Sequence, residues 1–451
     1  MELHNFIYYI NSLIIYPYIF LLLGTGIFLT IGLRFLTILK LPQTVINLLK
    51  GRKPVTTQGD ITPFQALTTE LSATIGTGNI AGVATAIFLG GPGAIFWMWI
   101  CAFFGMATKF CESFLAVKYR RVLKDGTISG GPMWYISQGL HIKWLARFFC
   151  FFGALSAFGI GNMAQSNSVA LVLRKCWKIP EATTGIFLAI LTALVIVGGI
   201  KRIGKVTEIL VPFMSLLYIG GALLILICNI PKIDDIFSLI LTHAFTPIAA
   251  SGGFSGAVVA HAIRYGIARG VFSNEAGLGS TPIAHAAAKT DSPLTQGFIS
   301  MSGVFFDTII ICSMTAFVIL LFPEAWTSGE NSSSLTSLAF NSGIPGIGKH
   351  IVTLSLAIFA YSTIIGWSYY GEKCVQYIFG FSAGSSYRWV YCIFVAIGSF
   401  CGVKLVWDLS DILNASMAIP NLIALLGLSS SIFREVRNRT QISADTRRKL
   451  F

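Results

Sequence analysis

The chain has 451 residues, of which 54% are hydrophobic and only 11% are charged. This composition excludes an ordinary soluble domain, and apolar runs of about 20 residues indicate membrane-spanning helices rather than the alternating strands of a β-barrel. The net charge of +13 would suggest a nucleic-acid-binding protein in a soluble chain, but here it follows from membrane topology, so we expect no nucleic-acid partner.

The apolar runs predict about eleven membrane-spanning helices. The first covers about residues 14–38 and is retained, because residues 1–33 lack the basic n-region of a cleavable signal. A longer polar stretch, 230–247, follows the sixth span. The other ten spans are predicted at about 64–89, 93–117, 143–173, 183–200, 207–229, 252–288, 296–322, 348–378, 387–406 and 409–432.

The basic residues lie mostly on one side of the predicted membrane. Most of the 32 Lys and Arg residues fall in alternate loops and in the tail after residue 432. Positively charged loops stay in the cytoplasm, which places the N-terminus outside and the C-terminus inside a cell membrane. The basic loops and tail are also expected to contact anionic lipids of the bilayer. The inside loops are predicted at 39–60, 118–147, 201–205, 289–293 and 373–388.

The stretch Leu71–Val83 in the second span is unusual for a helix surrounded by lipid. Gly76 and Gly78 are poor helix formers, and Thr77 and Asn79 are polar. Irregular backbone at membrane depth is tolerated only where it is buried in protein or lines a cavity. We therefore predict a broken helix whose free N–H and carbonyl groups bind ligands.

A second interruption indicates an internal repeat. With the first span set aside, the ten remaining spans divide into two sets of five, and the stretch 273–281 interrupts the first helix of the second set. Because each set has an odd number of spans, the two sets must insert with opposite orientations. The predicted divisions are an extra helix and loop at 1–63, repeats at 64–230 and 231–432, and a basic cytoplasmic tail at 433–451.

Five sequence blocks resemble the alanine/glycine:cation symporter family. The resemblance covers nearly the whole chain after the first span. It implies an all-α membrane protein with the leucine-transporter (LeuT-like) 5+5 inverted-repeat fold, in which the first helix of each repeat is discontinuous. It also implies a sodium-coupled carrier of alanine or glycine. The blocks lie at 71–83, 90–99, 130–133, 161–167 and 270–279.

The first break is expected to bind the carboxylate of the substrate. The backbone N–H groups of Thr77, Gly78 and Asn79 lose their helical acceptors where the helix opens, and glycine permits close approach. The alternative for these glycines is packing against a neighbouring helix. Gln165, in the fourth span, could hold the substrate amino group through its carbonyl oxygen, or could simply hydrogen-bond between helices.

The resemblance implies that the second break supplies the opposite wall of the site. Phe272 and Ser273 match substrate contacts of the family, and Gly277 and Gly279 are expected to leave room for the substrate. Trp367 is expected to close a small pocket that limits substrates to the size of alanine, with plain packing as the alternative.

A sodium ion is expected between the first break and the ninth span. Na⁺ is a hard cation that prefers oxygen ligands. The resemblance implies the hydroxyls of Ser362 and Thr363 and the carbonyls of Ser72 and Ile75. The alternative is that the hydroxyls bond back to their own helix. The nine cysteines contain no CxxC pair and predict neither a disulfide nor a metal site.

Several charged residues lie near the breaks. Glu70 precedes the first break, and Arg264 and Arg269 precede the second. We predict salt bridges that hold or gate the broken helices, with a position at the water interface as the alternative. Glu275 is interpreted as a gate, a helix-terminus residue or a partner for the substrate ammonium. Glu275 and Asp307 are the candidates if the coupling ion is a proton.

The predicted function is secondary active transport rather than catalysis. We expect a monomer that imports small neutral amino acids, namely alanine or glycine with D-alanine as a further candidate, coupled to sodium entry by alternating access. The alternative is a proton-coupled amino-acid permease of the same fold. A channel would need a continuous polar lining, and an enzyme would need a recognisable nucleophile and base; the sequence has no GxxxxGK[ST], HExxH or GxSxG motif.

Overall fold

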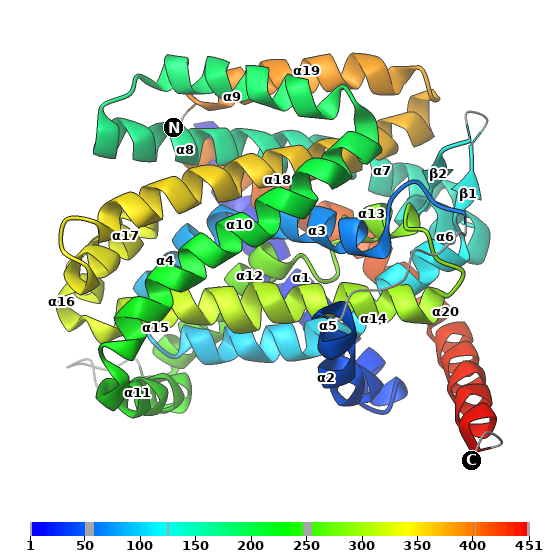
Figure 1. Ribbon diagram of the computed structural model, residues 1–451, viewed down its shortest axis with the longest axis horizontal. Coiled ribbons are helices and arrows are strands. Elements are labelled where there is room, and N and C mark those ends of the chain that lie inside the picture. Colours follow the sequence, from blue (N-terminus) through cyan, green and yellow to red (C-terminus); the bar gives the residue numbers. More distant parts are fainter. Residues whose placement is uncertain (1, 50–57, 124–125, 247–254, 402, 449–451) are drawn as a thin grey trace.

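The computed structural model describes residues 2–49, 58–123, 126–246, 255–401 and 403–448, and these residues are almost entirely helical (Figure 1). The first half contains α1 (Glu2–Gly32), α2 (Leu36–Leu49), α3 (Pro63–Thr74), η1 (Gly78–Gly82), α4 (Val83–Gly90), α5 (Ala94–Lys118), α6 (Pro132–Gly139), α7 (Lys143–Phe158), η2 (Gly159–Met163), α8 (Ala164–Trp177), α9 (Glu181–Ile196) and α10 (Gly199–Ile227). The second half contains η3 (Ile230–Lys232), α11 (Ile233–Phe245), α12 (Ser255–Asn274), α13 (Pro282–Ala286), α14 (Pro293–Val304), η4 (Phe305–Cys312), α15 (Ser313–Leu321), α16 (Pro323–Trp326), α17 (Ser332–Gly343), α18 (Gly348–Phe379), α19 (Ala383–Gly398) and α20 (Val403–Arg448). A two-stranded hairpin, β1 (Arg121–Val122) and β2 (Ile128–Ser129), follows α5.

The described part of the chain has six straight helical segments that are long and apolar enough to cross a membrane, and up to eight spans if two bent pairs are included. The helical membrane-protein class predicted from composition is therefore confirmed, whereas the number eleven remains a prediction. One bent pair is the first broken helix, in which Pro63–Thr74 and Gly78–Gly90 meet at 51°.

The helices form two groups. In the first, which we call the bundle, α5 packs along α14 and α12, and α12 packs against α4 (Figure 1). The bundle therefore contains both broken helices, α3–α4 and α12–α13, together with α5 and α14–α15. In the second, which we call the scaffold, α18 packs against α7 and α8, and α9 lies beside α19. Helix α3 also contacts α18, so the first broken helix lies at the boundary between the two groups.

The first predicted span ends earlier than its apolar run suggests. Helix α1 ends at Gly32, and α2 leaves it at an angle of 82°. Arg34 and Phe35 have positive φ values of 55° and 57°, so the chain turns where a basic residue interrupts the apolar run. The prediction of one helix over 14–38 is therefore wrong at its C-terminal end.

A second predicted boundary is also wrong. The predicted loop at 201–205 lies inside α10, because its basic side chains are exposed while Ile203 and Gly204 are buried on the opposite face. The polar stretch 230–247 contains helix α11. Helix α20 continues to Arg448, so the described residues of the predicted basic tail are helical.

Three π-helical segments interrupt the membrane helices. They are η1, η2 and η4, and each carries or precedes a buried polar residue, namely Asn79, Gln165 and Asp307. Single π turns inside α-helices are frequent at functional sites. These three segments position the polar side chains of the candidate site.

Candidate transport site

The first break follows directly from its local sequence. Helix α3 starts with a capping box between Thr62 and Gln65, and it ends at Thr74, after which Ile75 is extended with ψ of 93°. The side chain of Asn79 then takes the place of a helical acceptor, because its Oδ1 accepts the Gly76 N–H at 2.9 Å. The chain resumes helical form in η1, as the glycine-rich pattern predicts.

The second break is formed by residues with left-handed backbone conformations. Helix α12 ends at Asn274, and Glu275, Gly277 and Gly279 have φ values of 56°, 93° and 80°. Positive φ is uncommon for a non-glycine residue such as Glu275 and marks a strained position. The Asn274 Oδ1 atom accepts the Ala276 N–H at 3.0 Å and thereby stabilises the turn that follows α12.

The two breaks are in contact. A Cβ atom on Gly78 would lie 3.1 Å from the Phe272 ring and 3.2 Å from the Ser273 Cα atom. The absence of a side chain at Gly78 therefore permits this approach. Both Phe272 and Ser273 are buried, so the predicted substrate contacts of the two breaks lie together inside the bundle.

Gln165 joins the first break to the scaffold. Its Oε1 accepts the Thr77 N–H at 3.3 Å, and its Nε2 donates to the Ile160 carbonyl at 3.0 Å within η2. The buried hydroxyl of Thr77 has no hydrogen-bond partner among the described residues. A carboxylate ligand would supply the partner that this buried hydroxyl lacks.

The four predicted sodium ligands converge from α3 and α18. The Ser362 hydroxyl lies 3.1 Å from the Ser72 carbonyl and 3.5 Å from the Ile75 carbonyl, and the Thr363 hydroxyl lies 3.4 Å from the latter. Both hydroxyls also contact the carbonyl of Phe359 in their own helix. All four ligand residues are buried, so they place several oxygen atoms at one point between the bundle and the scaffold.

Trp367 connects the scaffold to the second break. Its indole N–H donates to Glu275 Oε1 at 2.8 Å, and Ser280 donates to Glu275 Oε2 at 2.5 Å. On its other side, Trp367 packs so closely on Gly161 of η2 that a Cβ there would lie 2.3 Å away. Glu275 therefore orients the indole in this structure, a contact that is not predictable from the sequence.

Gly277 and Gly279 do not face the first break. A Cβ on Gly277 would meet Leu22 and Leu422, at 3.3 and 3.2 Å. Gly279 lies against the ring of Pro132, and its N–H donates to Glu112 at 3.0 Å. The structure differs here from the expectation that these glycines leave room for substrate, because the left-handed turns direct this part of the break towards α1, α6 and α20.

Glu70 lies in a buried polar network that joins both broken helices to α5 and α14. Its Oε1 lies 3.2 Å from Lys109 Nζ, and its Oε2 bonds to His285 and accepts from Ser300 at 3.1 Å. Lys109 also donates to Thr281 at 2.7 Å. The partners of Glu70 and the role of His285 could not be predicted from the sequence, which signals only that a charge at membrane depth needs a partner.

The two arginines before the second break have different surroundings. Arg269 Nη2 lies 4.0 Å from Asp411 Oδ2 on α20, and its guanidinium lies 5.7 Å from the centre of the Phe272 ring. Arg264 lies 5.4 Å from the centre of the Tyr265 ring. Arg269 thus links the bundle to α20 beside a predicted substrate contact.

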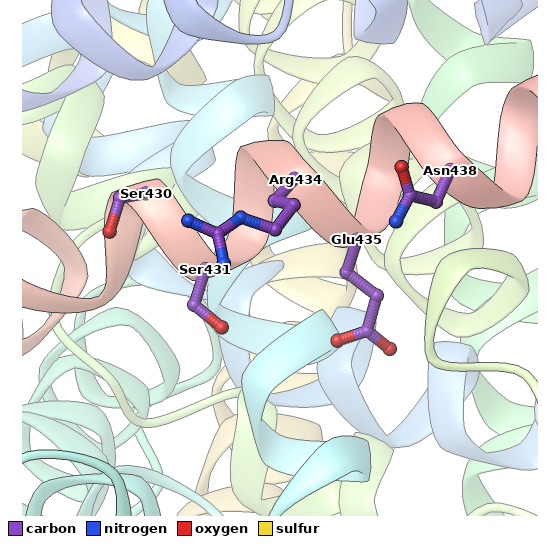
Figure 2. Close-up of a pocket in the computed structure, with 5 residues that line it drawn as sticks. All are labelled: Ser430, Ser431, Arg434, Glu435 and Asn438. Carbon is purple, nitrogen blue, oxygen red and sulfur yellow. The ribbon is translucent and has the colours of Figure 1, made fainter.

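A surface pocket of about 270 Å³ lies far along the chain from these residues. Five residues of α20 line it, and Figure 2 shows them on successive turns of this one helix: Ser430, Ser431, Arg434, Glu435 and Asn438. Glu435 forms an ion pair with Lys118 at the end of α5 at 2.5 Å. The pocket is built from one helix and includes none of the predicted substrate or sodium ligands.

Comparison with known proteins agrees with this arrangement. The fold is similar to that of MhsT, solved in complex with L-phenylalanine, with a TM-score of 0.58 and 14% identity over 83% of this chain and 90% of that one. The sequence is 49% identical to the sodium/alanine symporter AgcS of Methanococcus maripaludis, over 98% of each chain. It is 37% identical to the amino-acid carrier protein AlsT of Bacillus subtilis, over 94% of this chain and 91% of that one. The sequence model of the sodium:alanine symporter family matches residues 1–450, and the chain belongs to this family.

Proposed function

We propose that the protein imports a small neutral amino acid together with sodium. The observation that carries the proposal is the convergence of the Ser362 and Thr363 hydroxyls on the Ser72 and Ile75 carbonyls. These are hard oxygen ligands in a buried position, which suits Na⁺. The 49% identity to a protein named as a sodium/alanine symporter supports the same ion and substrate.

The proposed substrate position lies between the two breaks. The backbone N–H groups of the first break, of which that of Thr77 donates to Gln165 in this structure, and the unsatisfied Thr77 hydroxyl would bind the substrate carboxylate. Gln165 and Ser273 would contribute polar contacts, while Phe272 and Trp367 would enclose a short side chain. A pocket bounded by two aromatic rings favours alanine and glycine over larger amino acids.

The proposed mechanism is alternating access. The sodium site joins α3 of the bundle to α18 of the scaffold, so an ion bound there would stabilise one arrangement of the two groups. Substrate bound at the first break would stabilise the same arrangement, which is sufficient for coupling. We further propose a plasma-membrane location with the N-terminus outside and the C-terminus in the cytoplasm, on the basis of the basic loops.

The test is uptake of labelled L-alanine into proteoliposomes under an inward gradient of Na⁺ or of H⁺. Concentrative uptake with Na⁺ alone is expected. Uptake with H⁺ alone would favour the proton-coupled permease, for which the buried carboxylates Glu275 and Asp307 are the first residues to substitute. Absence of uptake under both gradients would contradict the alanine assignment and call for a wider panel of amino acids.

A further inference from the structure

Helix α2 begins at the level where two membrane helices change from apolar to basic sequence. A Cβ atom on Gly32, the last residue of α1, would overlap the ring of Phe433 on α20, so these two residues lie side by side. Arg34 follows α1, and Arg434 follows Phe433. Because basic side chains gather where a helix leaves the hydrocarbon core, Gly32 and Phe433 mark one boundary of the membrane.

Helix α2 runs along this boundary rather than across the membrane. It leaves α1 at an angle of 82°. Helix α1 has 31 residues and a length of about 46 Å, so it can cross the ~30 Å hydrocarbon core without any contribution from α2. Figure 1 shows α2 at the edge of the molecule, beside α5. The 14 residues of α2 therefore follow the plane of the membrane surface.

One face of α2 is packed on the bundle. The helix contacts α14 and α5, which both belong to this group. Thr37 is fully buried, and Ile38 and Leu41 pack against the hydrophobic core. A surface that binds the remaining faces of α2 is thereby attached to the bundle.

A second face of α2 presents large apolar side chains outwards. Phe35, just before the helix, and Leu39 and Ile46 within it are 46%, 73% and 50% exposed. Their spacing of four and seven residues brings them to the same side of the helix. Exposure of three such side chains to water is unfavourable, whereas the acyl chains at the membrane boundary would cover them.

The third face of α2 is polar and adjoins the apolar stripe. It carries Lys40, Gln43 and Asn47, which are three and four residues apart. Lys40 Nζ donates to Gln43 Oε1 at 3.2 Å. Within the described ranges, neither Lys40 nor Arg34 takes part in an ion pair. Both cations are therefore available to acidic groups outside the protein.

We propose that α2 is an in-plane anchor that binds the anionic phospholipid surface of the membrane. Phe35, Leu39 and Ile46 would insert among the acyl chains, while Arg34 and Lys40 would contact headgroup phosphates. The charge and the amphipathic pattern of α2 are those of helices that bind anionic lipids in the plane of a bilayer. Under the proposed topology the bound leaflet is the cytoplasmic one.

The experiment identifies the lipids next to α2. Leu39→Cys is made in a background without reactive cysteines, labelled with an apolar fluorophore, and the full chain is reconstituted into phosphatidylcholine vesicles. Spin-labelled phosphatidylglycerol or spin-labelled phosphatidylcholine is added in equal small proportion, and quenching gives the relative association constant of the two lipids. We expect both lipids to quench, with phosphatidylglycerol favoured roughly fivefold for each nearby basic residue.

Neutral variants test whether the two cations of α2 select the lipid. Arg34→Gln with Lys40→Gln should remove most of the preference for phosphatidylglycerol while quenching by phosphatidylcholine persists. The matched control is Lys201→Gln with Arg202→Gln, which removes the same charge from exposed positions on α10. The control should keep the native preference. Equal losses in both variants would overturn the proposal, because the preference would then follow the net charge of the protein.

A second probe position tests which face of α2 meets the bilayer. The fluorophore on Asn47→Cys, on the polar face, should be quenched by iodide present on both sides of the membrane and only weakly by spin-labelled lipid. The fluorophore on Leu39→Cys should show the reverse. Quenching of the latter by iodide alone would place this face in water, and protection from both quenchers would place it against another protein chain. Either result would overturn lipid binding by α2.

A further control measures the lipid preference of an ordinary membrane-facing position. Leu216 of α10 is 72% exposed. A fluorophore on Leu216→Cys should be quenched equally by the two spin-labelled lipids; a preference equal to that at Leu39 would contradict a specific role of α2. None of these measurements requires transport, so failure of the proposed function would appear separately, as no sodium-driven alanine flux in the native chain.

Discussion

At the scale of single residues, the missing side chain of Gly78 allows the two breaks to touch. A Cβ at this position would already lie 3.1 Å from the Phe272 ring, closer than an ordinary contact. We expect Gly78→Leu to abolish alanine uptake while membrane insertion persists, because the new side chain fills the proposed ligand space. Uptake per inserted molecule is the measurement. Gly82→Ala is the control, since a Cβ on Gly82 meets no atom within 4 Å; full uptake by Gly78→Leu would contradict the assignment.

The hydroxyls of α18 give a second prediction at this scale. Removing both with Ser362→Ala and Thr363→Ala should raise the Na⁺ concentration for half-maximal uptake by about tenfold or more, since each polar contact contributes about 1 kcal/mol. The measurement is initial uptake as a function of NaCl. Ser355→Ala is the matched control, because this buried serine of the same helix is not among the proposed ligands. An unchanged sodium dependence would place the ion elsewhere.

Trp367 is the residue most directly tied to substrate size. It is 1% exposed and is held between Glu275 and Gly161. Trp367→Ala should increase the uptake of larger neutral amino acids relative to alanine by about tenfold, because pocket volume discriminates by about this factor per methylene group. Competition between labelled alanine and a panel of neutral amino acids measures the ratio.

The control for Trp367 is Trp326→Ala on α16, which lies outside both breaks. Its substrate preference should match that of the native chain. If Trp367→Ala lost alanine uptake with no gain for larger amino acids, the indole would serve packing rather than substrate selection. Packing is the alternative that was stated above for this tryptophan.

At the scale of the elements, Glu70 links helices that are distant in sequence. It joins α3 to α5, α13 and α14 through Lys109, His285 and Ser300. Substituting one member of a buried ion pair leaves the other charge without a partner, which costs about 3–5 kcal/mol. We therefore expect Glu70→Gln to lower the thermal unfolding temperature clearly, and Lys109→Met added to it to restore part of the loss.

The unfolding temperature of both variants is measured on the purified protein in detergent. The control is a substitution in an exposed ion pair. Arg174 and Glu181 form such a pair, with the arginine side chain 66% exposed. Exposed pairs contribute about 0.2–1 kcal/mol, so Glu181→Gln should change the unfolding temperature little. Equal effects of Glu70→Gln and Glu181→Gln would show that the buried network does not hold the broken helices together.

The whole molecule is arranged as a bundle and a scaffold that meet at the first break. Gln165, Ser362 and Thr363 reach across this boundary from the scaffold to α3 and the residues that follow it. Asp307 and its partners stay inside the bundle. Movement of one group against the other would therefore change the proposed sodium site and leave the contacts of Asp307 unchanged.

The predicted topology can be tested on the whole molecule by cysteine labelling. In a background without reactive cysteines, Asn438→Cys on α20 should react with a membrane-impermeant maleimide only from the cytoplasmic side. Ser328→Cys, between α16 and α17, should react only from outside. Both positions are exposed, so access rather than burial decides the result. Labelling of both from the same side would contradict the orientation.

Local features of the sequence predicted the fold class and the two broken helices. Apolar run length determines whether a helix can cross a bilayer, and glycines such as Gly76 and Gly78 mark a break without reference to distant residues. The basic residues of α10 were predicted to form a loop because charge alone does not show that Ile203 and Gly204 are buried on the other face of one helix. The pairing of Ser362 with Ser72 came from resemblance to a family, not from periodicity.

Only the tertiary structure decided which polar groups meet and which way each break faces. The contacts of Asp307 with Asn79 and Ser273 join residues 228 and 34 positions apart, and no local pattern encodes such a distance. Gly277 and Gly279 face away from the first break because the direction of an irregular segment depends on left-handed turns and on the helices around it. The sequence by itself thus determined where the two glycine-containing helices break, since backbone propensity is local, whereas side-chain partners depend on how the helices rotate and pack.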